Sequence, residues 1–270
     1  MDKGFGLLLN LVRGRKPLVH HITNYVTVND CAYITLGIGA SPVMGDSVEE
    51  AADISAAADA LVLNMGTLSE RAVASMIAAG RSANAKGIPV VLDPVGVGGT
   101  KFRSAAAVRL VSEIELTVIR GNISEIKFMA GLDSKTKGVD ASEAVSADDA
   151  GQVAKGLAKK LNCIVVVSGA VDVISDGSKT AFIENGHPML SSVSGTGCMC
   201  SSLIGSFCGA SPNEAFAAAS AAMACMGAAG ETAHEKAGHL GNGSFRIALH
   251  DAVSRMDGET LERLVKYREV

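Results

Sequence analysis

The 270-residue chain has little charge and no long run of one sign. Lys, Arg, Asp and Glu together make up 19% of the residues, and the net charge is -4. Because no basic stretch is present, we do not expect a nucleic-acid groove. Hydrophobic residues make up 48% of the chain, which is too apolar for intrinsic disorder. With no linker, repeat or charge block to mark a boundary, we expect one domain over residues 1–270.

Paired cysteines, a signal peptide and a membrane span are also missing. The six cysteines contain no C-x-x-C pair and no histidine at zinc-ligand spacing, so neither a disulfide framework nor a zinc knuckle is expected. The N-terminus lacks the basic start and long apolar stretch of a signal peptide. The uncharged segment 215–229 is mostly small residues and is too short for a bilayer, so it is interpreted as a buried helix. A cytoplasmic protein without membrane contact is the prediction.

Three well-known catalytic or cofactor-binding motifs are absent as well. No G-x-x-x-x-G-K-[ST] sequence occurs, which excludes a P-loop enzyme. The segment 96–99 departs from G-x-G-x-x-G and follows an internal strand, which argues against a dinucleotide site. No G-x-S-x-G nucleophile elbow is present, so a hydrolase is disfavoured.

Short apolar runs bounded by turn residues alternate with stretches of helical periodicity. These runs are Ala60–Leu63, Pro89–Leu92, Leu116–Ile119 and Cys163–Val167. Alternation of this kind predicts βαβ units, and therefore an α/β fold with a mostly parallel sheet covered by helices on both faces. The runs 171–175 and 180–183 flank Asp176-Gly177 and predict an antiparallel hairpin at one side of the sheet.

Three serines are placed as helix N-caps. Ser47 and Ser146 each stand three residues before an acid, and Ser211 begins a Ser-Pro-Asn-Glu capping box. We therefore expect their side chains to accept hydrogen bonds from the first turn of the helix that follows each one.

A glycine-rich turn, Gly195-Thr196-Gly197-Cys198, leads directly into an apolar-periodic segment. The free N–H groups and the dipole of a helix beginning there favour a negative charge, and phosphate is the obvious candidate. A thiol in the first turn of such a helix is also expected to have a lowered pKa. The alternative is that the turn serves only to begin a helix and that Cys198 is an ordinary buried cysteine.

Polar residues follow several of the predicted strands, and the carboxyl ends of parallel strands meet at one edge of a sheet. A phosphate-transfer site needs a cation, carboxylates for magnesium and an acceptor for the hydroxyl proton. Arg120 supplies the cation, Asp93 and Glu125 the carboxylates, and Cys198 the acceptor, with Ser168 nearby. Taken singly, Asp93 fits a turn former and Glu125 a solvated first-turn acid equally well.

Five motifs in order resemble the hydroxyethylthiazole kinase family. They are Val19-His20-His21-Ile22-Thr23-Asn24, Gly39-Ala40-Ser41-Pro42-Val43-Met44, Asp93-Pro94-Val95-Gly96, Arg120-Gly121-Asn122-Ile123-Ser124-Glu125 and Gly195-Thr196-Gly197-Cys198. The resemblance implies a ribokinase-like fold. It also implies transfer of the γ-phosphate of ATP to the hydroxyl of 4-methyl-5-(2-hydroxyethyl)thiazole, a thiamine salvage step, with Mg²⁺ as cofactor.

The same resemblance assigns roles to individual residues. The catalytic set is Cys198, Gly197 and Gly195; the ATP-binding set is Arg120, Ser168, Asp93 and Asn122; the thiazole-binding set is Met44, Gly195 and Asn24; and the metal-binding pair is Asp93 and Glu125. Cys198 stands where related sugar kinases carry an aspartate base. His20 and His21 have no metal-ligand partners at useful spacing and are expected to be structural or to lie beside the substrate.

The resemblance to this family also implies a trimer whose thiazole pocket lies between subunits, with residues 24–44 forming one wall of the pocket. The apolar residues of that stretch fit an ordinary core helix or strand equally well. Tyr33 stands where asparagine is usual, so the substrate is less firmly predicted than the reaction. Two alternatives therefore stay open: a kinase for another small heterocyclic alcohol, and a thiazole-binding protein without phosphoryl transfer.

Overall fold

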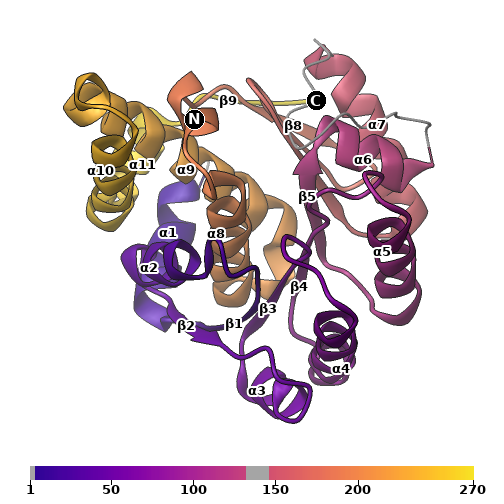
Figure 1. The fold of residues 1–270 in the computed structure, drawn as a ribbon. Coiled ribbons are helices and arrows are strands. Elements are labelled where there is room, and N and C mark those ends of the chain that lie inside the picture. Colours follow the sequence, from indigo (N-terminus) through magenta and orange to yellow (C-terminus); the bar gives the residue numbers. More distant parts are fainter. Residues whose placement is uncertain (1–3, 132–145) are drawn as a thin grey trace.

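The protein is described by a computed structural model over residues 4–131 and 146–270 (Figure 1). Within these ranges, nine strands form one sheet in the order β2-β1-β3-β4-β5-β6-β7-β8-β9. The strands are β1 (Leu18–Ile22), β2 (Ser41–Met44), β3 (Ala60–Asn64), β4 (Val90–Asp93), β5 (Val118–Asn122), β6 (Ile164–Ser168), β7 (Asp172–Ser175), β8 (Thr180–Ile183) and β9 (Tyr267–Glu269). Strands β2 to β6 are parallel, and β7, β8 and β9 continue the sheet antiparallel.

Helices cover both faces of the sheet, as expected from the alternating pattern (Figure 1). One face packs against α1 (Phe5–Arg15), α2 (Val28–Ile38), α8 (Thr196–Ala210), α9 (Ala215–Ala237), α10 (Asn242–Arg255) and α11 (Gly258–Leu264). The other packs against α3 (Ala51–Ala57), α4 (Glu70–Lys86), α5 (Lys101–Glu113), α6 (Ile123–Ala130) and α7 (Ala147–Leu161). Successive residues of a strand enter opposite cores: Val62 belongs to the first, Leu61 and Leu63 to the second.

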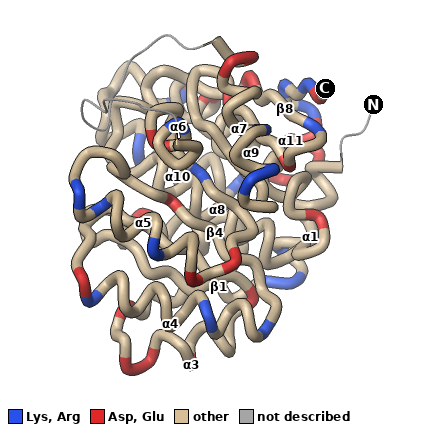
Figure 2. The backbone as a smooth tube through the Cα atoms, turned by 90° about the vertical axis from the view of Figure 1, so that its right-hand side faces the viewer, with Lys and Arg blue, Asp and Glu red and all other residues tan. Residues whose placement is uncertain are grey.

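Helix α8 lies directly on the sheet. A Cβ atom added at Gly205 would stand 2.4 Å from Val62 Cγ2 and 3.3 Å from Val19 Cγ1, so only glycine permits this approach. Figure 2, turned by 90°, shows α8 beside β4 and β1. The close packing sets the height of the α8 N-terminus above the ends of the parallel strands.

The predicted strands and hairpin are confirmed, with boundaries shifted by at most three residues. Three strands were not predicted: β1, β2 and β9. Strand β1 was missed because two buried histidines interrupt its apolar run, and β2 because it contains a proline. The segment 215–229 lies in the buried helix α9, as predicted. Among the described residues, no helix has both the length and the apolar character needed to cross a bilayer.

Of the three predicted caps, one is confirmed. Ser146 accepts a hydrogen bond from the Asp149 N–H at the start of α7. Ser47 does not cap α3, because its hydroxyl instead donates to Glu49 and the helix begins only at Ala51. The Ser211 hydroxyl makes no capping bond either, since a 3₁₀ turn over Pro212–Glu214 precedes α9.

Acidic and basic residues alternate around the molecule in the view of Figure 2 and do not gather over one element. The strongest concentration of buried charge lies inside the protein, at one edge of the sheet. That edge holds the predicted site.

Candidate active site

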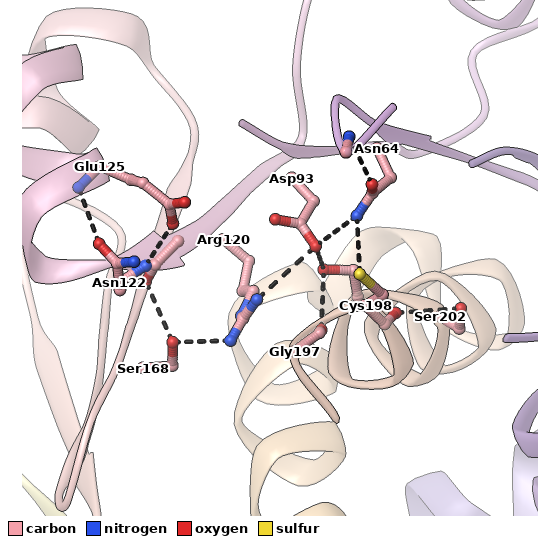
Figure 3. Close-up of polar contacts among 12 residues, drawn as sticks. Asn64, Asp93, Arg120, Asn122, Glu125, Ser168, Gly197, Cys198 and Ser202 are labelled. Carbon is pink, nitrogen blue, oxygen red and sulfur yellow. Dashed lines mark hydrogen bonds and ion pairs between the residues drawn. The ribbon is translucent and has the colours of Figure 1, made fainter. Parts of the chain in front are cut away.

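The polar residues predicted at strand ends converge at the carboxyl edge of the parallel sheet. Strand register brings them together: Asn64 at the end of β3 pairs with Asp93 at the end of β4, and Asn122 of β5 pairs with Ser168 of β6. Helix α8 begins above the same edge. Figure 3 shows the side chains of Asp93 and Arg120 directed toward the first turn of α8.

Asp93 and Arg120 form a buried ion pair at the centre of this cluster. Arg120 Nη1 lies 3.6 Å from Asp93 Oδ2, with side-chain exposures of 12% and 0%. Arg120 Nη2 donates to Ser168 Oγ at 2.7 Å, and Ser201 Oγ donates to Asp93 Oδ2 at 2.8 Å. Burial raises the pKa of Asp93, and the Arg120 charge opposes that rise. Burial alone would lower the pKa of Arg120, but the Asp93 charge holds it above its usual value.

Two glycines shape the turn that faces the ion pair. A Cβ atom at Gly197 would stand 2.6 Å from Arg120 Nη1, so the guanidinium lies against the backbone of the first turn of α8. Gly195, the residue before α8, has φ of 93°, a left-handed conformation that favours glycine. A guanidinium and a helix N-terminus are both positive, so placing them side by side favours an anion between them.

Glu125 lies in the first turn of α6 and is buried, not solvated. Asn122 and Glu125 form a capping box, in which the Asn122 side chain accepts from the Glu125 N–H at 2.9 Å. The Glu125 carboxylate accepts from Asn122 N at 2.8 Å and from Gly96 N at 2.9 Å. Burial and the nearby Asp93 charge both raise the pKa of Glu125. The box therefore holds a carboxylate rigidly at the same edge as Asp93.

Cys198 lies in the first turn of α8, as predicted, and is half-buried. Asn64 Nδ2 lies 3.2 Å and Asn24 Nδ2 3.4 Å from its sulfur. The expectation of a lowered thiol pKa was wrong: burial and the Asp93 charge raise the pKa of Cys198, and hydrogen bonds from Thr27 and Asn24 oppose them only in part. The prediction considered the helix N-terminus and omitted burial of the thiol, the largest cause, and the Asp93 carboxylate near it.

Asn24 joins this cluster, whereas Met44 lies at the edge of the sheet. Asn24 follows β1 and donates to Asn64 Oδ1 at 2.9 Å. Met44 ends the edge strand β2, where it pairs with His21. Of the predicted thiazole-contacting residues, Asn24 and Gly195 therefore lie with the cluster and the α8 turn, whereas strands β1 and β3 stand between Met44 and Asp93.

Asn64 was not selected from the sequence, although it follows the apolar run 60–63 directly. It is buried and donates to Asp93 Oδ2 at 2.8 Å. The same rule that selected Asp93, a polar residue at the end of an apolar run, would have found it.

His20 and His21 of β1 are both buried and hydrogen-bonded. His20 lies between Ser55 Oγ at 2.8 Å and the Gly45 carbonyl at 2.7 Å. Burial lowers the pKa of His20, and it lowers the pKa of His21 to about 4. Both imidazoles are therefore neutral near pH 7 and act as parts of the core.

The cluster has the properties expected of a magnesium and phosphate site. In the described part of the chain, Asp93 Oδ1 and Arg120 Nε are buried without a hydrogen-bond partner. Two buried carboxylates with raised pKa values favour a cation beside them. No group of three or more His, Cys, Asp or Glu side chains that could hold a metal occurs in these residues. Mg²⁺ fits such a site, because it is commonly bound by one or two carboxylates together with substrate phosphates.

A groove lies at the opposite end of the sheet from this cluster. This groove of about 750 Å³ runs along the amino ends of the central strands and is lined by Asn84, Thr117 and Cys163, among others. It contains none of the residues of the ion-pair cluster. The groove is therefore separate from the edge where charge is buried.

Curated relatives match the chain over nearly its whole length. The hydroxyethylthiazole kinase of Clostridium beijerinckii is 55% identical over 268 residues, covering 98% of this chain and 97% of that protein. That of Ruminiclostridium cellulolyticum is 53% identical over 264 residues, covering 97% and 96%.

Solved structures show the same fold. The hydroxyethylthiazole kinase protein of Pyrococcus horikoshii OT3 superposes with a TM-score of 0.90 at 38% identity and covers 99% of both chains. A Bacillus subtilis pyridoxal kinase, solved as an ADP complex, superposes at 0.59 with 18% identity, covering 79% of this chain and 91% of its own. The expected ribokinase-like fold is confirmed.

The family model for hydroxyethylthiazole kinases matches residues 9–259, which include the ion-pair cluster, the capping box and the α8 turn. The chain therefore belongs to the hydroxyethylthiazole kinase family.

Proposed function

We propose that this protein transfers the γ-phosphoryl group of ATP to the hydroxyl of 4-methyl-5-(2-hydroxyethyl)thiazole, a step of thiamine salvage. The observation that carries the proposal is the buried Asp93–Arg120 pair facing the first turn of α8, in a chain 55% identical to a curated hydroxyethylthiazole kinase. Phosphoryl transfer depends mainly on positioning and on stabilising charge on the phosphoryl oxygens. A guanidinium beside a helix N-terminus supplies both.

The ATP phosphates would lie between Arg120 and the backbone N–H groups of Gly197 and Cys198. Ser168 and Asn122 stand beside Arg120 at the ends of β6 and β5, where they extend the nucleotide site. Asp93 and Glu125 would hold Mg²⁺, directly or through water. When bound, the ion neutralises charge on the phosphates and orients them.

The hydroxyl proton passes to Cys198 in this proposal. Its pKa is raised by burial and by the Asp93 charge, so the thiolate is a minor form near neutral pH. A modest base is compatible with the reaction, because the transition state of phosphoryl transfer is largely dissociative and demands little proton removal.

The thiazole would lie between Asn24, Gly195 and Met44, on the β2 side of the ion pair. We also propose a trimer with this pocket at a subunit interface. Four large apolar side chains on or next to α2 support an interface there: Tyr25, Val26, Tyr33 and Leu36 are 79%, 61%, 60% and 56% exposed. Sedimentation of the purified protein at several concentrations tests the trimer, and a monomer would contradict it.

All six cysteines are free, and five of them are buried, which is the state of thiols in a reducing compartment. We therefore place the protein in the cytoplasm. Detection in a cell fraction other than the cytosol would contradict this placement.

The decisive experiment is ADP release from Mg-ATP by the purified protein, with the phosphorylated product identified by mass. Controls omit the alcohol or replace the thiazole with a pyrimidine alcohol. Product that depends on the thiazole supports the proposal. ADP formed only with another alcohol would indicate a changed substrate, and thiazole binding without ADP would indicate a binding protein.

A further inference from the structure

Asn64 touches both of the groups to which the proposed reaction assigns chemistry. Its Nδ2 donates to Asp93 Oδ2 at 2.8 Å and to Cys198 Sγ at 3.2 Å. Its Oδ1 accepts from Gly66 N and from Asn24 Nδ2, each at 2.9 Å. The residue is 3% exposed, so these four contacts account for both N–H groups and both lone pairs of the amide.

The orientation of this amide is fixed by the backbone. Gly66 N–H can only donate, so the Asn64 oxygen must face it and the NH₂ group must face Asp93 and Cys198. The reversed orientation would place two donors against each other at Gly66 and an oxygen against the Asp93 carboxylate. A buried polar group without a partner costs about 1–3 kcal/mol, so the reversed state is strongly disfavoured.

Asn24 is oriented in the same manner and directs a second N–H toward the sulfur. Its Oδ1 accepts from Val26 N and Thr27 N, both at 3.1 Å, which leaves Nδ2 facing Cys198 at 3.4 Å. The sulfur therefore faces two amide donors whose directions are set by the backbone. Donors of this kind favour an electron-rich sulfur and oppose the effects of burial and of the Asp93 charge.

We propose that Asn64 is a positioning residue for phosphoryl transfer: one amide holds the Asp93 carboxylate and the Cys198 sulfur at a fixed separation, with an acceptor atom of each turned toward it. This inference rests on the proposed function. Both groups act during transfer of the phosphoryl group, so loss of the amide acts on kcat more than on KM.

Two substitutions separate this role from simple packing. Asn64→Ala removes the amide and leaves a small void. Asn64→Asp keeps the shape and the acceptor for Gly66 N, but places an oxygen where the NH₂ group faced Asp93. Positioning by donation predicts that the Asp variant loses more kcat than the Ala variant, whereas packing alone predicts the reverse order.

We expect kcat to fall by about 10- to 100-fold in the Ala variant and further in the Asp variant, with KM for both substrates within about threefold of the parent. Asn84→Ala is the matched control, because Asn84 bonds the Glu115 backbone through both ends of its amide at the opposite end of the sheet. Its kcat should be unchanged. Unchanged kcat in a folded Asn64→Ala variant, or an Asp variant more active than the Ala variant, overturns the proposal.

Thiol alkylation gives a readout that does not depend on turnover. Five cysteines are buried and Cys198 is half-buried, so the fast alkylation by iodoacetamide that disappears in Cys198→Ala reports this thiol. Asn64→Asp preserves the shape of the site but replaces the N–H donor with a carboxylate oxygen, and Asn64→Ala removes the donor without adding charge, so alkylation at a fixed pH should be slower in both variants. An alkylation rate equal to that of the parent would overturn the proposed donation from Asn64 Nδ2 to Cys198 Sγ. The parent protein's failure to turn over thiazole would refute the proposed function alone, and alkylation would still decide the role of Asn64 toward the sulfur.

Discussion

The two ends of the central sheet differ in how their polar groups are satisfied. At the carboxyl ends, Asp93 Oδ1 and Arg120 Nε are buried and have no hydrogen-bond partner among the described residues. At the amino ends, Asn84 Nδ2 donates to the Glu115 carbonyl at 2.9 Å and Asn84 Oδ1 accepts from Glu115 N at 2.8 Å, while Thr117 Oγ1 accepts from Val90 N at 3.0 Å.

The groove therefore lies at the end whose polar groups are satisfied. The groove of about 750 Å³ lies along the amino ends, where backbone and side chains bond one another. The carboxyl ends hold the Asp93–Arg120 ion pair, of which one oxygen and one nitrogen have no hydrogen-bond partner among the described residues. Because a buried polar atom without a partner is costly, these two atoms mark the carboxyl end as the better candidate for a ligand site.

The largest expected effect comes from Cys198. Cys198→Ala should lower kcat by about 10²- to 10⁴-fold, the usual contribution of a general base. Cys198→Asp should restore turnover, because a carboxylate ionises more readily than this buried thiol. Steady-state kinetics of the two variants checks both outcomes, and full activity in the Ala variant would contradict the base assignment.

The same residue predicts the direction of the pH dependence. Because burial and Asp93 raise the pKa of the thiol, the thiolate fraction grows as pH rises, and kcat/KM of the parent should rise with pH through the alkaline range. Cys198→Asp should reach its plateau at a lower pH. A pH profile that is the same for parent and variant would remove Cys198 from proton transfer.

Replacing a buried polar group that already has hydrogen-bond partners should change stability and leave kcat unchanged. His21 tests this expectation for the satisfied groups of the molecule. Its Nδ1 bonds the Val19 carbonyl at 3.1 Å, and its pKa is lowered from 6.5 to about 4 by burial. As pH falls, the unfolded chain binds a proton at His21 at a higher pH than the folded protein does. The free energy of unfolding is therefore unaffected by His21 above pH 6.5 and falls by up to about 3 kcal/mol as pH drops to 4.

Urea unfolding at several pH values measures that loss. His21→Asn should flatten the curve between pH 6.5 and 4 while leaving kcat within about twofold of the parent. The effect of Asp172 on the pH dependence of stability has the opposite sign. Burial raises the pKa of Asp172 to about 7, so its contribution to stability is lost as pH rises through that value. An unchanged slope in the variant would show that His21 does not govern the acid side.

Arg120 sharpens the comparison at the ligand-binding end. Arg120→Ala should weaken ATP binding by about 2 kcal/mol, the scale of a lost hydrogen bond to a charged group, which titration calorimetry measures. Arg81→Ala is the control, because Arg81 is 66% exposed and pairs with Glu113 on the protein surface. Equal ATP affinity in the two variants would place the nucleotide elsewhere.

The smallest effect is expected at the amino ends. Asn84→Ala removes two hydrogen bonds to the Glu115 backbone and should lower the free energy of unfolding by about 1–2 kcal/mol. Activity should stay at the parent level. A fall in kcat without a fall in stability would show that the groove takes part in the reaction.

The sequence predicts the parallel core and its reactive edge because strand ends and turn residues are local signals. Asp93 and Arg120 were found in this way, and Asn64 could have been. The direction of the Cys198 pKa shift was not predicted, because it depends first on burial of the thiol and then on Asp93, which lies 105 residues away along the chain; both follow from the packing of α8. The Ser47 and Ser211 caps failed for a related reason, since the chain continues into a turn before each helix begins.

The position of α8 in the chain has a consequence for synthesis of the protein. Strands β1, β3 and β4 all precede residue 94, yet helix α8, which packs on them and carries Cys198, begins only at Thr196. During translation, Asp93 therefore leaves the ribosome well before Cys198 does. Val19 and Val62 stay without the cover of α8 until Gly205 has been made. Until α8 is made, part of one apolar face of the sheet lacks its cover, and exposed apolar surface of this kind makes a nascent chain prone to aggregate during translation.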